Sequence, residues 1–222
     1  LFCKERLLKK IMDFGSYLVS DFPDPDDAFT RIKYSLDLYL DEEINAPRLR
    51  EIVPSDQMYG SYWYRSGINT SMPVQLNDIV TEITSRVKHD VGDIWLDIAC
   101  NDGTMFKSIP HTYAKFGIDP ADESYTNEAG LYAYVVQDFF NKDTFFKMSE
   151  GVKARVITCI AMFYDVEDPH AFLRDVRECL HDDGTFALQM SYTPLMVKQL
   201  AFDNICHEHV YYYALTDIKK LM

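Results

Sequence analysis

The sequence has few basic residues, no two cysteines at CxxC spacing and no apolar run of the length that crosses a membrane. Its 22 Lys and Arg stand against 35 Asp and Glu, a formal net charge of −13. Because phosphate binding needs a basic surface, this balance argues against a nucleic-acid or anionic-membrane partner. A spanning helix needs roughly 20 apolar residues and a secretory signal needs an apolar leader, so we expect a cytoplasmic protein.

The number and spacing of the cysteines predict no disulfide pattern and no metal site that would constrain the fold. The five cysteines are odd in number and far apart, so neither a disulfide pattern nor a complete zinc site can be read from them. They are Cys3, Cys100, Cys159, Cys179 and Cys206. We expect reduced, buried thiols, because a free Cys packs like a small hydrophobe.

Three regions differ in pattern: an appendage at 1–53, an aromatic segment with a linking helix at 54–91, and a core at 92–222. The apolar fraction of 47% is enough for a hydrophobic core. In the appendage, alternating apolar residues over 32–40 predict one half-buried strand. In the second region, the fourfold spacing of Ile79, Ile83 and Val87 predicts a helix, with Pro73 in its first turn.

From Gly92 onward, short apolar segments alternate with amphipathic ones. The predicted strands are 94–99, 113–119, 133–137, 155–161 and 185–191. The predicted helices lie near Met105, near Glu123, near Thr144 and at 171–180. This alternation predicts an α/β fold in which a sheet of five parallel strands is covered on both faces.

Acidic residues lie at the ends of the first three predicted strands, at Asp97, Asp119 and Asp138. In such sheets ligands bind beyond the carboxyl ends of the strands, and an acidic residue about 20 positions after the first turn suits the ribose hydroxyls of adenosine. A single acidic residue in this position is more often a helix cap or turn former. No GxGxxG is present, which disfavours a pyrophosphate cofactor and suits a nucleoside.

Three segments resemble the sugar C-methyltransferases that act on nucleotide-linked deoxysugars, and the likeness covers nearly the whole chain. Residues 97–103 resemble that family's acidic-x-x-x-Asn-Asp-Gly cofactor loop. Residues 58–72 are similar to the segment before its core, with Tyr62 and Tyr64 matching paired tyrosines. Residues 202–209 resemble its Asp-x-x-Tyr-His-Glu-His signature, with Cys206 where tyrosine is usual.

The resemblance implies a Rossmann-like class I methyltransferase sheet that binds S-adenosylmethionine. The residues it implies for the cofactor are Asp97, Ala99, Asn101, Asp102, Gly103, Asp119, Asp138 and Phe139. It implies methylation of a carbon atom in a nucleotide-linked keto-deoxysugar by way of an enolate. No metal is expected in this reaction.

Removal of a carbon-bound proton needs a base, and histidine has the pKa that suits the task. His207, Glu208 and His209 lie in one short segment. The resemblance implies that Glu208 and His209 do the acid–base work, helped by Tyr62 or Tyr64. Without the resemblance, His-x-His is also a minimal metal pair or an ordinary polar surface turn.

The chain departs from the family at its N-terminal end, where relatives carry a small zinc module with two CxxC pairs. Cys3 matches one ligand, but the other positions fall at Arg6, Asp41 and Ile44, which cannot form a tetrahedral site. We therefore expect no zinc. The appendage would be held by packing of its Leu36, Leu38 and Leu40 face.

At the other end, relatives continue past the helix at 215–222 into two more strands and a further domain. A sheet that ends at its fifth strand exposes an edge, which proteins normally cover or pair. Either the chain is a fragment, or another copy or a partner completes the sheet. Two other functions stay open: a degenerate cofactor-binding or scaffold module, and an O- or N-methyltransferase or NAD-dependent enzyme on a related sheet.

Overall fold

The computed structural model describes residues 8–19, 31–54, 57–58 and 64–222. Its contacts divide the chain into two units. The first, here the sheet unit, is made of Tyr59–Ile160 and Ala171–Gln189. The second, here the N/C unit, is made of Leu1–Met58, Ala161–His170 and Met190–Met222. Residues 190–222, which the sequence pattern grouped with the core, thus pack with the N-terminal strands.

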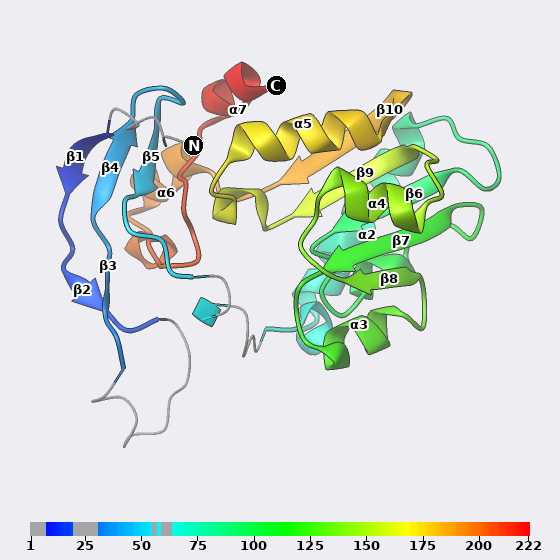
Figure 1. Cartoon of the computed structure of the whole chain (residues 1–222), viewed down its shortest axis with the longest axis horizontal. Helices are drawn as coiled ribbons and strands as arrows, with labels where there is room; N and C mark the ends of the chain where they lie inside the picture. Colours follow the sequence, from blue (N-terminus) through cyan, green and yellow to red (C-terminus); the bar gives the residue numbers. More distant parts are fainter. Residues whose placement is uncertain (1–7, 20–30, 55–56, 59–63) are drawn as a thin grey trace. The chain divides into compact units, whose positions relative to one another are not determined.

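The sheet unit contains five strands in the order β10-β9-β6-β7-β8, all parallel. Their bounds are β6 Ile94–Ile98, β7 Ala114–Asp119, β8 Tyr134–Gln137, β9 Ala154–Ile160 and β10 Leu180–Gln189. The predicted α/β class and five-stranded parallel sheet are confirmed (Figure 1). The chain starts at the central strand β6, builds β7 and β8 on one side and then β9 and β10 on the other. This reversal is the point at which open α/β sheets bind ligands.

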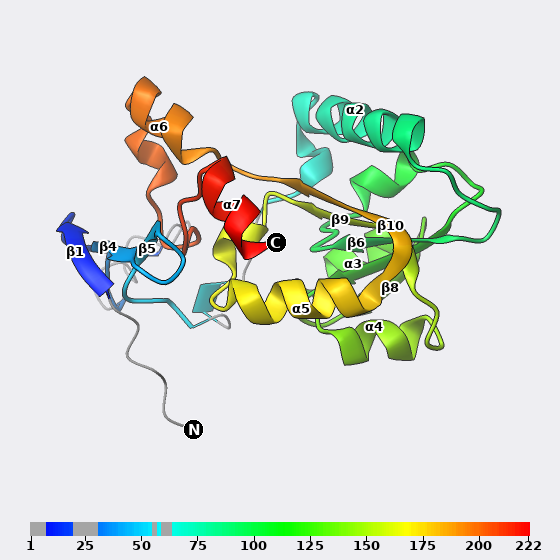
Figure 2. The same ribbon diagram turned by 90° about the horizontal axis from the view of Figure 1, so that it is seen from above.

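Helices cover both faces of this sheet. Figure 2 shows α2 on one face and α4 and α5 on the other. The helices and 3-10 turns of the unit are η1 Ser66–Ile68, α2 Ser71–Arg86, η2 Thr104–Lys107, α3 Glu123–Ala129, α4 Lys142–Met148 and α5 Pro169–Cys179. The buried face of α2 is formed by Leu76, Val80 and Ile83, which pack with Trp95 and Phe106 in one apolar cluster. Burial of each such aliphatic side chain contributes about 1.5–3 kcal/mol.

Three local predictions need correction. The helix expected near Met105 is only the 3-10 turn η2, because Pro110 follows closely and disfavours α geometry before it. The strand expected over 32–40 is two short strands, because the Ser35 hydroxyl accepts the Asp37 N–H and turns the chain. The last strand begins at Leu180 rather than Thr185, with a register shift between these two residues.

The N/C unit is built from short strands and helices that are distant in the sequence. β1, β4 and β5 form an antiparallel sheet, and β2 pairs with β3. The strands are β1 Leu8–Met12, β2 Ser16–Tyr17, β3 Tyr34–Ser35, β4 Leu38–Asp41 and β5 Ala46–Leu49. The helical elements are η3 Phe163–Asp165, α6 Thr193–Gln199, η4 Phe202–Asn204 and α7 Leu215–Leu221.

Residues near 210 close the N-terminal sheet by backbone hydrogen bonds and packing. Leu49 N–H donates to the Val210 carbonyl at 2.9 Å, and Tyr212 N–H donates to the Pro47 carbonyl at 2.9 Å. Leu38, Leu49 and Tyr212 form an apolar cluster. The half-buried side chains packed against this cluster are Phe14, Leu36, Met196 and Ile205. Leu36 and Leu38 therefore pack as expected, but their partners come from the other end of the chain.

A buried polar network accompanies this packing. The Tyr211 hydroxyl donates to Asp41 at 2.9 Å and accepts from the Arg48 guanidinium at 2.8 Å, while Arg48 lies 3.8 Å from Asp41. The Asp41 carboxylate also accepts the N–H groups of Glu43 and Ile44. Asp41 stands at a position where the resemblance placed a zinc ligand. In this chain its carboxylate organises a turn and an ion pair.

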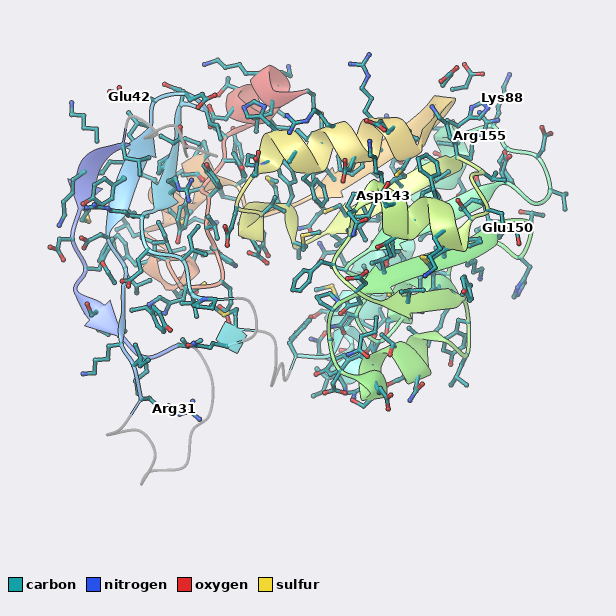
Figure 3. All side chains as sticks on the ribbon, in the orientation of Figure 1. Arg31, Glu42, Lys88, Asp143, Glu150 and Arg155 are labelled. Atoms are coloured by element: carbon teal, nitrogen blue, oxygen red, sulfur yellow. The ribbon has the colours of Figure 1, made fainter. Side chains whose placement is uncertain are left out.

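Lys88, Asp143 and Glu150 are exposed charged residues on the outside of the sheet unit (Figure 3). Within the described ranges, no helix has both the length and the apolar character that a membrane span requires. The cysteines among the described residues are free; Cys100, Cys159 and Cys179 are buried and Cys206 is half-buried.

Candidate functional site

The loop after β6 has an unusual backbone. Ala99, Asn101 and Gly103 have φ values of 58°, 52° and 73°, in the left-handed region that non-glycine residues avoid at a cost of about 1–2 kcal/mol. Hydrogen bonds hold the strained residues in place. Ala99 N–H donates to the Ile118 carbonyl at 2.8 Å, and Asn101 N–H donates to the Asp119 carboxylate at 2.7 Å. Strain that is held in this way clusters at ligand sites.

Asp97 is a buried carboxyl group at the end of β6, 4% exposed. It accepts the Thr158 hydroxyl at 2.6 Å, and Thr158 in turn accepts the Trp95 indole N–H at 3.1 Å. Burial raises the pKa of Asp97 to about 7, and the charge of Asp119 adds to this effect. Among the described residues, no Lys or Arg offsets the charge of Asp97.

Asp119 ends β7 and is 5% exposed. Its carboxylate accepts the N–H of Asn101 and, at 2.8 Å, the N–H of Ala121. Burial raises its pKa, while these two backbone hydrogen bonds lower it. The sheet thus brings Asp97 and Asp119 to one edge as two buried acidic groups whose charges repel each other.

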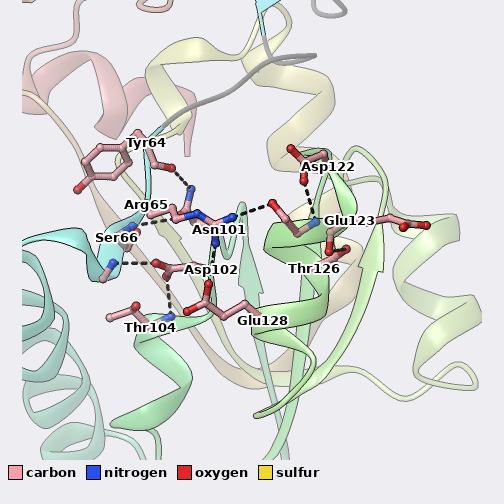
Figure 4. A network of polar contacts seen from close by, with 12 residues as sticks. Tyr64, Arg65, Ser66, Asn101, Asp102, Thr104, Asp122, Glu123, Thr126 and Glu128 are labelled. Carbon is pink, nitrogen blue, oxygen red and sulfur yellow. Dashed lines mark hydrogen bonds and ion pairs between the residues drawn. The ribbon is translucent and has the colours of Figure 1, made fainter.

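Asn101 and Asp102 bind the backbone of the segment 64–67, as Figure 4 shows. The Asn101 side chain accepts the Ser66 N–H at 2.9 Å and donates to the Tyr64 carbonyl at 3.0 Å. The Asp102 carboxylate accepts the Gly67 N–H at 2.8 Å and the Thr104 N–H at 3.1 Å. Both side chains were predicted as cofactor contacts; the structure shows them fixing this segment beside the loop.

Arg65 holds the same segment to α3. Its guanidinium lies 2.6 Å from Glu128, donates to the Ser124 hydroxyl at 2.7 Å and lies 4.1 Å from the centre of the Tyr125 ring. No sequence pattern indicates this contact, because Arg65 and Glu128 are 63 positions apart. Arg65 is therefore a residue of the site region that sequence reasoning missed.

Gly103 is required by packing as well as by its backbone angle. A Cβ atom at this position would lie 2.6 Å from the Ala129 Cα atom in α3. Gly103 therefore lies close against this helix, and its contact with the cofactor stays a prediction.

Asp138 follows β8, and its N–H donates to the Asp119 carbonyl at 3.1 Å. Its carboxylate accepts the Phe139 N–H at 2.8 Å and the Thr144 hydroxyl at 2.9 Å. Asp138 is exposed, and Phe139 is 51% exposed. The two residues lie next along the edge from Asp119, and Asp138 also stabilises the start of α4.

The predicted catalytic segment 207–209 belongs to the N/C unit. His207 is 3% exposed, and its Nε2 atom lies 3.0 Å from the Tyr34 carbonyl oxygen. A carbonyl can only accept, so this ring nitrogen donates. That contact ties the segment to β3 and gives His207 a structural task.

His209 has the geometry of a base. Its Nδ1 atom lies 2.8 Å from the Asn204 carbonyl, which can only accept, so Nδ1 carries the hydrogen and Nε2 keeps its lone pair. Its ring packs against Tyr164 with a centroid distance of 4.2 Å. Burial lowers the pKa of His209, which keeps the imidazole neutral and able to accept a proton.

Glu208 is half-buried, and its negative charge raises the pKa of His209. Tyr62, a predicted helper, lies outside the described residues. Tyr64 is described and belongs to the sheet unit, where burial raises the pKa of its phenol.

Residues 69–222 match a family model described as a methyltransferase domain. This match spans more than half of the chain. The chain belongs to that methyltransferase family.

Single proteins are also similar to the chain. The C-methyltransferase NovU of Streptomyces niveus is 25% identical over an alignment of 217 residues, which covers 92% of this chain and 50% of that protein. The chain therefore spans half the length of this curated relative.

Solved methyltransferase structures share the fold. The plantazolicin methyltransferase BpumL in complex with SAH has a TM-score of 0.53 at 16% identity, covering 68% of this chain and 63% of its own. A Haloferax volcanii methyltransferase in complex with the Trm112 activator also has a TM-score of 0.53 at 16% identity, covering 68% of each chain. At these identities the likeness concerns the fold alone.

Proposed function

We propose that this methyltransferase transfers a methyl group from S-adenosylmethionine to a carbon of a nucleotide-linked keto-deoxysugar through an enolate. The observation that carries the proposal is His209, whose Nδ1 is fixed by the Asn204 carbonyl while Nε2 keeps its lone pair beside Glu208. A neutral imidazole held in one tautomer is suited to accept a carbon-bound proton. The likeness to the C-methyltransferase NovU supports methylation of a carbon atom.

The residues at the edge of the sheet fit this cofactor. Asp97 and Asp119 are buried acids whose charges no Lys or Arg offsets among the described residues. A ligand with a positively charged amino group and sulfonium, such as S-adenosylmethionine, would offset them. In this proposal Asp97 binds the amino group, Asp119 binds the ribose hydroxyls, and Asp138 with Phe139 binds the adenine.

In this proposal, the backbone of the loop 99–103 forms the part of the cofactor site that the acidic side chains do not form. Its left-handed residues are already held in place by Asp119 and the Ile118 carbonyl. The cofactor supplies the electrophilic methyl group when bound. A loop that is ordered beforehand reduces the entropy lost on binding.

Side chains of the protein carry out the proton transfer in this proposal. The His209 Nε2 atom removes the proton from the carbon next to the ketone, and the Glu208 carboxylate stabilises the resulting imidazolium. Tyr64, together with Tyr62, is proposed to donate to the enolate oxygen, since donors aimed at a developing oxyanion supply much of the rate. When the cofactor is bound, transfer of its methyl group would need mainly alignment of the carbanion, the methyl group and the sulfur.

Two measurements test the proposal in sequence. Calorimetry with S-adenosylhomocysteine tests the cofactor site, and transfer of a labelled methyl group to a nucleotide-linked keto-sugar tests the reaction. His209→Ala and Glu208→Gln should lower turnover by about 10²–10⁴-fold and leave cofactor affinity unchanged. His111→Ala, an exposed histidine outside the site, is the matched control. Unchanged turnover in both site variants would refute the base assignment.

Two results would favour the alternatives. Cofactor binding without turnover on any keto-sugar would favour a scaffold or binding module, which agrees with the use of Asn101 and Asp102 to hold the segment 64–67. Label recovered on oxygen or nitrogen of the product would favour an O- or N-methyltransferase. Absence of S-adenosylhomocysteine binding would exclude both the enzyme and the cofactor-binding module.

A further inference from the structure

Segment 64–67 is fastened to the loop 99–103 by a side chain of that loop. The Asn101 side chain accepts the Ser66 N–H at 2.9 Å and donates to the Tyr64 carbonyl at 3.0 Å (Figure 4). Asn101 is buried, with 9% of its surface exposed, so water competes little for these hydrogen bonds. The proposed reaction assigns no task to either contact.

The segment also packs tightly on the loop at Gly67. The Gly67 N–H donates to the Asp102 carboxylate at 2.8 Å. A Cβ atom at position 67 would lie 2.9 Å from the Thr104 Oγ1 atom and 3.1 Å from the Asp102 Oδ2 atom. Even a methyl group at this position would therefore push the segment away from the loop.

The backbone of Asn101 is bound to the carboxylate that is proposed to hold the ribose. The Asn101 N–H donates to Asp119 at 2.7 Å, and the φ angle of Asn101 is 52°. A left-handed backbone at a residue other than glycine persists only where its surroundings hold it. Asn101 thus joins Asp119, through its N–H, to segment 64–67, through its side chain.

A second connection runs from Asp119 to the same segment through α3. Asp119 accepts the Ala121 N–H at 2.8 Å, and Asp122 caps α3 by accepting the Ser124 N–H at 2.7 Å. The Ser124 hydroxyl accepts from the Arg65 guanidinium at 2.7 Å. Both connections therefore start at the Asp119 carboxylate and end on the backbone or side chains of one short segment.

We propose that Asn101 is a positioning residue that couples cofactor binding at Asp119 to the order of segment 64–67. A ligand bonded to Asp119 restrains that carboxylate, and the carboxylate restrains the strained backbone of Asn101. The Asn101 side chain carries the restraint to the segment. Such coupling is reciprocal, so a well-ordered segment raises the affinity for the cofactor by the same factor.

The coupling has a consequence for the reaction. Tyr64 belongs to the segment and is the proposed donor to the enolate oxygen, so bound cofactor steadies this donor. The enolate then meets its donor only in enzyme that already holds the methyl group. The inference rests on the proposed function, since it needs the ribose at Asp119.

Hydrogen exchange of backbone amides in the full chain tests the coupling without any substitution. Saturating S-adenosylhomocysteine should slow exchange at Ser66 and Gly67 by about fivefold or more. The N–H groups of Ser71 and Met72, which donate to Asn69 rather than to the loop, should exchange at unchanged rates. Exchange at Ser66 that does not respond to bound S-adenosylhomocysteine would overturn the proposal.

Asn101→Gly removes the side chain and keeps the N–H that Asp119 accepts, because glycine readily adopts a left-handed backbone. In this variant S-adenosylhomocysteine should no longer slow exchange at Ser66, and its Kd should rise by the factor that is lost in protection. A purely structural Asn101 would keep the wild-type ratio of exchange rates with and without the ligand, which would refute the coupling. Asn45→Gly, at an exposed position of the N/C unit with a φ of 65°, is the matched control and should change neither quantity.

Gly67→Ala breaks the same link from the side of the segment and leaves the residues of the loop unchanged. It should also raise the Kd of S-adenosylhomocysteine. In the double variant with Asn101→Gly the two effects should not add, because each substitution removes one and the same link. Additive effects would mean that the Asn101 side chain contacts the cofactor directly, and would overturn the proposal. Thermal unfolding reports whether each variant folds, and the wild-type exchange experiment decides where one does not.

Turnover separates this inference from the proposed function. Protection of Ser66 by S-adenosylhomocysteine, without methyl transfer to any keto-sugar, would leave the coupling and remove the proposed reaction. Methyl transfer without such protection would remove the coupling and leave the reaction. Absence of S-adenosylhomocysteine binding would overturn both.

Discussion

Replacement of the buried Asp97 by Asn should stabilise the protein and weaken cofactor binding at the same time. The pKa of Asp97 is raised from 3.8 to about 7, so the folded state holds its proton where the unfolded state has lost it. This carboxyl group therefore costs stability increasingly as pH rises from about 4 to about 7. Between pH 5 and pH 8 the wild type should lose about 3 kcal/mol relative to Asp97→Asn.

The assay is thermal or urea unfolding of both proteins without cofactor at pH 5, 6, 7 and 8. For a chain of this size, about 3 kcal/mol corresponds to roughly 6–12 °C in Tm. Asp78→Asn, an exposed acid on α2, is the control and should give a difference that does not change with pH. A stability difference between wild type and Asp97→Asn that is flat from pH 5 to pH 8 would refute the reasoning.

The same substitution should weaken S-adenosylhomocysteine binding at pH 8. A hydrogen bond to a charged group is worth about 1.5–3 kcal/mol, which corresponds to roughly a tenfold to hundredfold higher Kd. Calorimetry measures it directly. The Thr158 hydroxyl, which donates to Asp97 in the wild type, can still donate to the amide oxygen of the variant, so a local collapse is not expected. Unchanged affinity would remove Asp97 from the cofactor site.

Three further predictions concern stability. Gly103→Ala should lower the free energy of unfolding by about 3 kcal/mol, because the new Cβ atom meets Ala129 and the φ angle is 73°. Urea unfolding measures this change. A decrease of less than about 1 kcal/mol would contradict the prediction. Arg48→Met should lower the free energy of unfolding by about 3 kcal/mol, since it removes the buried cation beside Asp41. The matched double variant Arg48→Met/Asp41→Asn should recover part of this stability. Arg65→Met removes a half-exposed ion pair and should lower the free energy of unfolding by only about 1 kcal/mol. Hydrogen exchange of the backbone amides at residues 64–67 should nevertheless become faster. Exchange as slow as in the wild type would contradict the role of Arg65 in holding this segment.

The sheet could be predicted because its signals are local and repeated. Each strand is a short apolar segment, and Asp97, Asp119 and Asp138 lie at the ends of three successive strands, which must meet at one edge in a parallel sheet. The helix α2 was predictable from the spacing of its apolar residues. The break in the strand over 32–40 depends on one hydroxyl, Ser35, and no periodicity reveals such a contact.

The contacts that the sequence could not show join residues far apart in the chain. Arg65 meets Glu128, and no pattern in the sequence links the two residues. Asn101 illustrates a different limit. Its residue type suits a ligand contact and a backbone clamp equally well, and only the structure shows that its side chain holds Ser66 and Tyr64.

The closure of the N-terminal sheet by residues near 210 has a consequence for the order of folding. Arg48 and Tyr211 are 163 positions apart, and Leu49 relies on the Val210 carbonyl for its N–H. During synthesis, Leu38 and Leu49 in strands β4 and β5 stay exposed until the segment near residue 210 has been made. Until then Asp41 also lacks the hydrogen bond that the Tyr211 hydroxyl donates. Contacts of such long range form slowly. Strands β4 and β5 are made before the segment near residue 210, and they are therefore expected to become native only after that segment is present.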